Sequence, residues 1–397
     1  MRAKLQDTKF FTTRPHRAKA YCDDLSLIST NREEHKSALH LIDARCKCLD
    51  LHLKPSKCIS LAFNGKRIVP NATFPLSSGS TTNIHDHPTK FLGKTLADCP
   101  KSTGQSASQR LKALILPQLT ALDETPVRGE YKTWMLNHSL LPSLHFHLMV
   151  NDIPKSHVYS LQRLLTRMVK KWLHLPRCTT PSAIFHPNSL DLKFLPLFLE
   201  EAKMSLLTTV AHSTDPHVLE CLPSLQDPSY LKASYLDPKA VERFQTAVAQ
   251  CRAEPHTPKK PQVLAKCKKL AREKQVQDWE NHLSQLTVQN GLLDILPLGA
   301  EDHLWQRFLT GMPAGQLSFI LRASCDCLPC PSSLVQWGYS LNRKCPLCNG
   351  PLCNVQHVLN CCPTALTDGR YTWRHDMVLT ALLPFLQRFN PEASVYA

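Results

Sequence analysis

The spacing of apolar residues over the first hundred positions predicts a mixture of strands and helices. Apolar residues on both sides of a short polar turn predict two strands over 19–29. Residues 32–53 carry apolar side chains at steps of three and four, which is typical of a helix with one buried face. Strand character returns over 54–63, and another short element begins at 91–93. The pattern therefore predicts an α+β region.

After Cys99 the pattern becomes predominantly helical. Leucine-rich segments recur over 106–122, 131–150, 154–174 and 195–212. The clearest stripe consists of residues at helical spacing, namely Leu161, Leu164, Leu165, Met168, Trp172 and Leu175. Four cations, Arg163, Arg167, Lys170 and Lys171, lie largely off this stripe. The segment thus predicts an amphipathic helix with a basic outer face.

Changes in composition divide the chain further. A proline-rich stretch over 213–262 predicts an irregular linker, and a lysine-rich helix is expected to follow over 263–283. The resulting domain prediction has six parts. They are an α+β region over 1–100, a helical region over 101–212, the linker over 213–262, a second helical region over 263–340, a small Cys/His module over 341–380 and a final stretch over 381–397.

The charge balance favours a polyanionic partner. The chain has 47 Lys and Arg against 32 Asp and Glu, a net charge of +15, with 19 His in addition. Nucleic acid is the leading class of partner for such a chain, although a basic surface can also serve solubility alone.

The cysteine content changes the picture, because the sequence shows no export signal. The first residues lack the apolar core of a signal peptide, and no window reaches the ~18 apolar residues that a membrane span needs. We therefore expect a nuclear or cytoplasmic protein, neither secreted nor membrane-bound. In such a compartment, an odd number of cysteines, 17, argues for reduced thiols, which makes metal binding the first explanation to test.

A Cys/His cluster near the C-terminus has the spacing of a zinc site. Two cysteines separated by two residues are followed by a histidine and a further cysteine, and together they can surround one tetrahedral Zn²⁺. The predicted ligands are Cys345, Cys348, His357 and Cys362. Cys361 could replace Cys362, and Cys353 is an unused thiol within the loop. Burial of the cysteines in an ordinary core does not explain this spacing.

A second cysteine-rich segment, 325–330, could suggest another zinc site. It has no histidine nearby, and its sequence is typical of a helix end followed by a proline turn. We therefore expect no metal there.

Two adjacent carboxylates, Asp23 and Asp24, lie at the predicted turn between the first two strands. Adjacent residues at a hairpin turn can approach one site, where a carboxylate pair usually holds divalent cations. In phosphoryl transfer, two such metals activate the attacking oxygen and stabilise the leaving oxygen. Taken alone, an Asp-Asp pair is more often a solvated turn.

The surrounding residues resemble a known motif. Tyr-Cys-Asp-Asp followed by Leu-Ser-Leu-Ile, over 21–28, resembles the Tyr-x-Asp-Asp motif on the palm hairpin of reverse transcriptases. Residues 52–63 and 91–93 also resemble segments of that palm, the latter its primer grip. The resemblance implies Mg²⁺ (or Mn²⁺) held by Asp23, with Asp24 as its acidic neighbour. It also implies that Lys57 lies near the incoming deoxynucleoside triphosphate; otherwise, Lys57 is a solvated loop residue.

The resemblance extends through most of the chain. Residues 138–146, 171–177 and 194–203 resemble the thumb of non-LTR retrotransposons of the site-specific type that carry a restriction-like endonuclease. Residues 317–329 and 369–379 resemble the region between their polymerase and endonuclease. This implies a partial reverse-transcriptase palm, a mostly α-helical thumb and linker, and a CCHC zinc knuckle. It further implies RNA-directed DNA polymerase activity in target-primed reverse transcription, with an RNA template and target DNA as partners.

The chain also departs from this family. Family members have a further metal-binding Asp on an earlier strand, fingers that hold the triphosphate and a C-terminal nuclease, whereas only 20 residues precede Tyr21 here. We therefore expect a fragment, truncated at both ends, that is inactive alone. The alternative is a non-catalytic nucleic-acid-binding protein that retains thumb and zinc knuckle.

Two groups of cations are candidate nucleic-acid contacts. The thumb of polymerases lies along the primer–template, so the cations of the amphipathic helix, Arg163, Arg167, Lys170 and Lys171, are expected to contact phosphates. A solvated helix face is the alternative. Arg370 and Arg374 lie beside Tyr371 and Trp373, whose rings could stack on bases or instead pack over the zinc loop.

Overall fold

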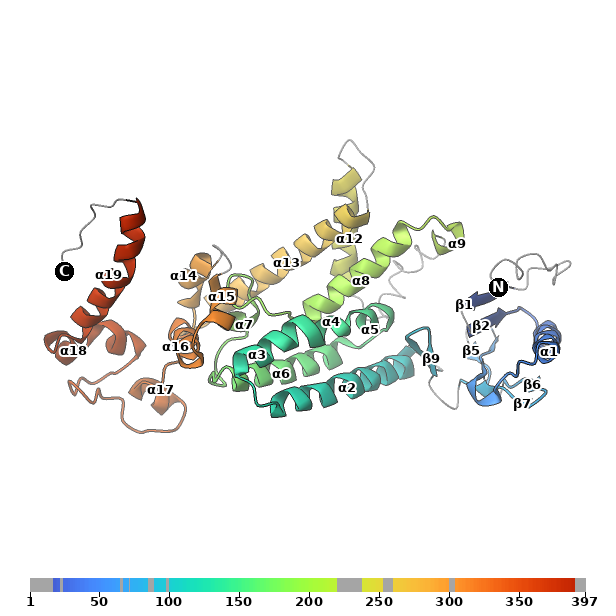
Figure 1. The fold of residues 1–397 in the computed structure, drawn as a ribbon, viewed down its shortest axis with the longest axis horizontal. Coiled ribbons are helices and arrows are strands. Elements are labelled where there is room, and N and C mark those ends of the chain that lie inside the picture. Colours follow the sequence, from blue (N-terminus) through green and yellow to red (C-terminus); the bar gives the residue numbers. More distant parts are fainter. Residues whose placement is uncertain are drawn as a thin grey trace. The chain divides into compact units, whose positions relative to one another are not determined.

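The structure is a computed structural model that describes residues 17–21, 24–64, 67–70, 72–84, 89–97, 100–219, 238–252, 260–299 and 304–389 (Figure 1). The chain divides into two compact units. The first comprises Met1–Leu111, Val150–Pro154 and Lys232–Tyr235, and the second comprises the remaining residues.

The first unit begins with a β-hairpin. Strands β1 (Arg17–Tyr21) and β2 (Asp24–Ile28) pair antiparallel, with Tyr21 opposite Asp24. Only two residues, 22 and 23, connect the paired ends, and they lie outside the described residues. The predicted pair of strands over 19–29 is confirmed.

Helix α1 (Arg32–Cys48) follows the hairpin. Its N-terminus is capped by Asn31, whose Oδ1 accepts a hydrogen bond from the backbone N–H of Glu33 at 2.8 Å. The helix ends at Cys48, before the predicted residue 53, because Asp50 adopts a left-handed backbone with a φ of 57°. Leu49 is consequently 72% exposed and does not contribute to the buried face.

The rest of the first unit consists of short strands. They are β3 (Ile59–Ser60), β4 (Phe63–Asn64), β5 (Arg67–Ile68), β6 (Pro75–Leu76), β7 (Gly79–Ser80), β8 (Thr82–Asn83), β9 (Thr89–Phe91) and β10 (Lys94–Leu96). Strand β3 pairs parallel to β8, and the hairpins β4–β5, β6–β7 and β9–β10 are antiparallel. The expected strand over 54–63 is interrupted, because Pro55 begins a 3₁₀ turn, Pro55–Lys57 (η1). Leu92 and Gly93 form the β9–β10 turn, both with positive φ.

Helix α2 (Pro100–Glu124) begins in the first unit and continues into the second. Among the described residues, the other helices up to Leu219 are α3 (Gly129–Met135), η2, a π-helical turn (Leu136–Leu140), α4 (Leu141–Ser143), α5 (His145–Val150), α6 (Lys155–Trp172), α7 (Ser182–Phe185), α8 (Leu195–Ala211) and α9 (Pro216–Leu219). Those from Pro238 onward are α12 (Pro238–Arg252), α13 (Lys260–Ser284), α14 (Leu292–Ile295), the 3₁₀ turn η3 (Leu296–Gly299), α15 (Leu304–Gly311), α16 (Ala314–Ser324), α17 (Pro331–Gln336), the π-helical turn η5 (His357–Cys361), α18 (Pro363–Thr367) and α19 (Arg370–Phe389). The mostly helical character predicted after Cys99 is confirmed.

Helix α6 contributes much of the core of the second unit. Its buried residues are Val158, Leu161, Gln162, Leu165, Val169 and Trp172. Most of the predicted stripe is therefore buried, while Leu164 and Met168 are only partly buried. The indole Nε1 of Trp172 donates to Asp123 Oδ1 at 2.8 Å, and Lys171 Nζ pairs with Asp123 Oδ2 at 2.7 Å. These bonds attach the end of α6 to the end of α2, and they hold the pKa of Asp123 below its usual value.

The prediction of an irregular linker over 213–262 is wrong for three parts of it: residues 216–219 form α9, residues 238–252 form α12, and α13 starts at Lys260. Helix α12 buries Ala240, Phe244 and Ala247 in one cluster with residues of α8 and α13. These apolar residues lie three or four positions apart, which is helical spacing. The prolines at 238 and 261 stand in the first turns of α12 and α13, where proline is tolerated.

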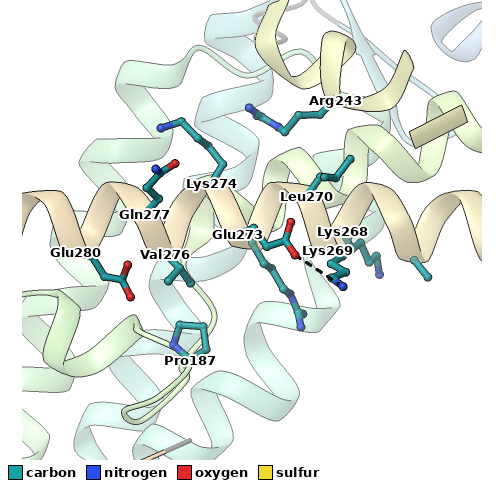
Figure 2. Close-up of a pocket in the computed structure, with 12 residues that line it drawn as sticks. Pro187, Arg243, Lys268, Lys269, Leu270, Glu273, Lys274, Val276, Gln277 and Glu280 are labelled. Atoms are coloured by element: carbon teal, nitrogen blue, oxygen red, sulfur yellow. Dashed lines mark ion pairs between the residues drawn. The ribbon is translucent and has the colours of Figure 1, made fainter. Parts of the chain in front are cut away.

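The lysine-rich helix α13, predicted over 263–283, is confirmed, and three of its six Lys and Arg side chains form ion pairs. Figure 2 shows the side chains that line a hollow along this helix. Arg272 Nε lies 3.0 Å from Glu201 of α8, Lys269 lies 3.8 Å from Glu273, and Lys274 pairs with Asp278. From α12, Arg243 pairs with Glu200 of α8 at 2.5 Å. Much of the positive charge along α13 is thus compensated within the protein.

A close contact between α3 and α6 provides a test of this packing. A Cβ atom at Gly129 would overlap the backbone carbonyl of Trp172, whereas a Cβ at Gly315 would meet nothing within 4 Å. We expect Gly129→Ala to lower the free energy of unfolding by about 2–4 kcal/mol, because backbone must move. Gly315→Ala, the matched control in α16, should be neutral or stabilising by up to about 1 kcal/mol. Urea denaturation measures both changes, and equal stabilities would contradict this packing.

Candidate metal centre

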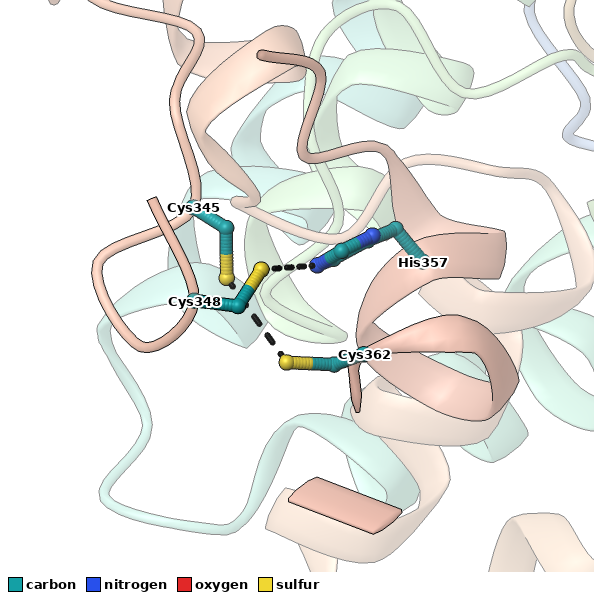
Figure 3. A group of neighbouring side chains, drawn as sticks. All are labelled: Cys345, Cys348, His357 and Cys362. Atoms are coloured by element: carbon teal, nitrogen blue, oxygen red, sulfur yellow. Dashed lines mark hydrogen bonds between the residues drawn. The ribbon is translucent and has the colours of Figure 1, made fainter. Parts of the chain in front are cut away.

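Four side chains near the C-terminus converge on one point. Cys345 and Cys348 lie on a tight turn, His357 begins the π-helical turn η5, and Cys362 directly follows it. Their ligand atoms all lie within 4.8 Å of one another (Figure 3). The cluster is one that could bind Zn²⁺.

The distances fit a tetrahedral zinc site. Cys345 Sγ lies 3.9 Å from Cys362 Sγ, and Cys348 Sγ lies 3.4 Å from His357 Nε2. With Zn–S bonds of about 2.3 Å and Zn–N bonds of about 2.0–2.1 Å, a tetrahedron has S–S edges of about 3.8 Å and S–N edges of about 3.6 Å. The observed pairs thus have nearly the separation that a shared Zn²⁺ imposes.

Backbone hydrogen bonds shape the turn that carries the first two thiols. Cys345 N–H donates to Gly350 O at 2.9 Å, and Gly350 N–H donates to Cys348 Sγ at 3.4 Å. The N–H group of Cys348, followed by that of Leu347, hydrogen-bonds the Cys345 sulfur and lowers the pKa of its thiol to about 6. The thiolate, which is the form that binds metal, is therefore favoured at this position.

The structure distinguishes between the neighbouring cysteines. Cys362 is 2% exposed and belongs to the cluster, whereas Cys361 is exposed and does not. Cys353 is also buried, but desolvation raises the pKa of its thiol to about 12. A thiol in this state is a protonated core side chain, as the sequence predicted for an unused cysteine.

Tyr371 of α19 holds the second half of the cluster in place. Its hydroxyl accepts a hydrogen bond from Cys362 N–H at 3.0 Å and donates to His357 O at 3.2 Å. His357 N–H in turn donates to Asn354 Oδ1 at 2.8 Å. The sequence left two roles open for Tyr371, base stacking and packing over the zinc loop, and the structure shows the packing.

The second cysteine-rich segment follows the end of α16 and precedes α17, as predicted for a helix end and proline turn. Its cysteines face two different apolar clusters. Cys325 and Cys327 pack with Leu283 and Leu292, whereas Cys330 packs elsewhere, with Val355. Among the described residues, these three thiols are not part of a metal-binding group.

The candidate polymerase residues lie in the first unit. Asp23 lies outside the described residues, and Asp24 is described as the first residue of β2 through its backbone alone. Lys57 is exposed at the end of the 3₁₀ turn. The roles of these three residues therefore remain predictions.

The cations of α6 differ in their partners. Arg163 and Arg167 are exposed on the outer face. Lys170 Nζ donates to the carbonyl of Arg177 at 2.8 Å, and Lys171 pairs with Asp123 as described above. The two arginines are therefore better placed for an external phosphate than the two lysines.

A hollow of about 1080 Å³ adjoins the metal cluster in the second unit. Arg370 and Arg374 line it, together with Trp373, which is 67% exposed. Arg370 pairs with Asp368 at 2.6 Å, and the Arg374 guanidinium lies 5.0 Å from the centre of the Tyr371 ring. Sequence reasoning missed the lining residues from before the module, among them His174, Phe319 and Arg322. No local pattern marks them, because they come together only through the packing of α16.

Metal binding can be tested on the full chain. We expect about one Co²⁺ or Zn²⁺ per chain, with thiolate-to-cobalt charge-transfer absorption that is lost in Cys345→Ala and His357→Ala. Cys362→Ser should weaken Zn²⁺ binding at least ten-fold, because it removes a ligand. Its matched control, Cys361→Ser, should bind as the parent does. Comparable losses in the two serine variants, measured by competition with a chelator, would contradict the ligand set.

Within the described ranges, no helix combines the length and apolar character needed to cross a membrane.

The chain is similar to a known protein over part of its length. No family model matches the chain. A stretch of 176 residues, 43% of the chain, is 25% identical to the "Retrovirus-related Pol polyprotein from type-1 retrotransposable element R2" of Nasonia vitripennis. This stretch covers 16% of that relative, so the chain spans a small part of its length. The chain is thus distantly similar to a retrotransposon Pol polyprotein.

Proposed function

We propose that the chain is a segment of a retrotransposon RNA-directed DNA polymerase, and that its second unit binds nucleic acid next to a Zn²⁺ module. The observation that carries the proposal is the similarity over 176 residues to a Pol polyprotein. The Tyr-Cys-Asp-Asp sequence at the β1–β2 hairpin supports it, since this motif is the one that resembles the palm of reverse transcriptases.

The catalytic part of the proposal concerns the hairpin. The hairpin pairs Tyr21 with Asp24, and Asp23 directly precedes Asp24 in the sequence. Carboxylate oxygens are the ligands that Mg²⁺ and Mn²⁺ prefer. Asp23 and Asp24 would hold the divalent cations that two-metal nucleotidyl transfer requires in target-primed reverse transcription. Lys57 would contribute a positive charge toward the triphosphate.

The role of zinc in this proposal is structural. Four ligands form a closed site with no open position for a substrate or a water molecule. With Zn²⁺ bound, the turn at Cys345 would be held to η5 and Cys362. Tyr371 joins the start of α19 to these residues, which places Arg370, Trp373 and Arg374 beside the module. Cations and exposed aromatic rings side by side suit nucleic acid, through phosphate contacts and base stacking. The RNA template or the target DNA is the partner that the Pol similarity supports.

A non-catalytic binding protein is the second candidate function. The observation that favours it is the division of the chain, since the zinc module and the thumb cations lie in the second unit and the aspartate pair in the first. Binding therefore depends on residues other than those that catalysis requires. The two functions are separated by the following two experiments.

Binding should depend steeply on salt. Replacing Arg163 and Arg167 together by Gln should weaken binding of a primed RNA template and reduce the slope of log K against log salt by about 2, since each lost phosphate contact contributes about one unit. The matched control is Lys269→Gln, since Lys269 is 67% exposed but pairs with Glu273. Fluorescence anisotropy titrations measure both. Absence of binding at low ionic strength would remove the nucleic-acid proposal.

Catalysis is tested by primer extension. We expect the 397-residue chain to bind a primed RNA template with Mg²⁺ without extending the primer, because the resemblance implies a third metal-binding Asp without a counterpart in this sequence. Asp23→Ala should leave template binding unchanged. Incorporation of nucleotides that is lost in Asp23→Ala would overturn this expectation and favour a complete catalytic centre.

A further inference from the structure

Two cysteines that are far apart in the sequence are neighbours in the second unit. Cys178, in the loop after α6, has its Sγ 3.7 Å from Cys327 Sγ, in the segment after α16. The two residues are 149 positions apart. The sequence offered no reason to pair them, and the zinc module does not include them.

The two thiols differ in environment. Cys178 is exposed to solvent, whereas Cys327 is 2% exposed and packs with Ala183, Leu283 and Leu292. Burial raises the pKa of the Cys327 thiol, so it remains protonated at rest. The half-buried ammonium of Lys170 interacts electrostatically with the sulfurs of both residues. A nearby cation and partial exposure are typical of reactive thiols.

Hydrogen bonds between side chains and backbone groups already connect the two segments. Ser318 Oγ donates to the carbonyl of His174 at 3.3 Å, and Arg322 Nε donates to the same carbonyl at 3.0 Å. Gln289, between α13 and α14, binds the segment that contains Cys178. Its Oε1 accepts from Thr180 N–H at 2.7 Å, and its Nε2 donates to Cys178 O at 2.8 Å. Bringing the sulfurs to bonding distance thus requires a small local movement rather than docking of two separate parts.

We propose that Cys178 and Cys327 are an oxidisable dithiol that forms an intramolecular disulfide with hydrogen peroxide. Cys178, as thiolate, attacks one peroxide oxygen and breaks the O–O bond, which gives a sulfenic acid and, after proton uptake, one water. The Cys327 sulfur then attacks the Cys178 sulfur, and the hydroxyl leaves as a second water with the Cys327 proton. Two thiols are oxidised to one disulfide, and one peroxide is reduced to two waters.

The bond would connect the loop after α6 covalently with the segment that leads into the zinc module. His174, four residues before Cys178, and Leu328, directly after Cys327, both line the hollow beside the metal cluster. The oxidised chain would therefore hold these two sides of the hollow together. In a reducing compartment such a bond is transient, which makes the pair a redox-responsive element rather than a permanent crosslink.

Peptide mapping of the zinc-loaded full chain tests the proposal. After treatment with about one equivalent of hydrogen peroxide, a non-reducing digest should contain a peptide joining Cys178 to Cys327, and dithiothreitol should remove it. Cys178→Ser should abolish the link. Cys361→Ser, which removes another exposed cysteine, should retain it.

A second measurement follows the consequence for stability. The oxidised protein should unfold at a temperature about 5 °C higher than the reduced protein, reversibly with dithiothreitol, because the crosslink closes a long loop. Oxidation of Cys178 to sulfinic acid without a linked peptide, or a link from Cys178 to Cys325, would overturn the proposal. The map of the parent protein distinguishes these outcomes even if a variant fails to fold.

Discussion

The C-terminal part of the second unit depends on the convergence of four ligand atoms within 4.8 Å. The buried cluster there consists of Cys345, Cys353, Cys362 and Ala365, so ligand side chains form half of its core. Such a small core buries too little apolar surface to order the chain by the hydrophobic effect alone. A Zn²⁺ ion held by these four ligands would supply the missing free energy and would fix how the turn and the π-helical turn meet. Tyr371 links α19 to Cys362 and His357, so Trp373 and Arg374 lie beside this convergence.

The cations of this protein differ in whether they are paired with carboxylates or exposed to solvent. Along α13, half of the Lys and Arg side chains are paired with carboxylates, and Arg272 reaches Glu201 on α8. These pairs belong to helix packing, and a nucleic acid would have to compete with them. On the outer face of α6 the arginines are exposed instead, while Lys171 anchors Asp123. A net charge of +15 therefore indicates a class of partner, but the pairing of individual residues decides where a phosphate can bind.

The two units contribute differently to the proposed function. The first contains the hairpin that carries the aspartate pair, and the second contains the helices, the zinc cluster and the dithiol. In the proposed function, two different kinds of metal site would thereby lie in different units. Carboxylates suit a hard cation such as Mg²⁺, whereas thiolates and an imidazole suit Zn²⁺.

Local patterns in the sequence determined the hairpin, α1, the amphipathic α6, the lysine-rich α13 and the zinc ligands. Each depends on spacing within one segment, and even Cys362 is only 17 residues from Cys345. The helix α12 was missed because prolines on either side suggested a linker, although apolar residues at helical spacing decided the outcome through packing on α8. Tertiary structure alone decided that Lys171 is ion-paired, that Tyr371 supports the zinc loop and that Cys178 meets Cys327 across 149 residues. The physical reason is that periodicity and ligand spacing act along the chain, whereas the partner of a charged or reactive side chain is set by which helices pack together.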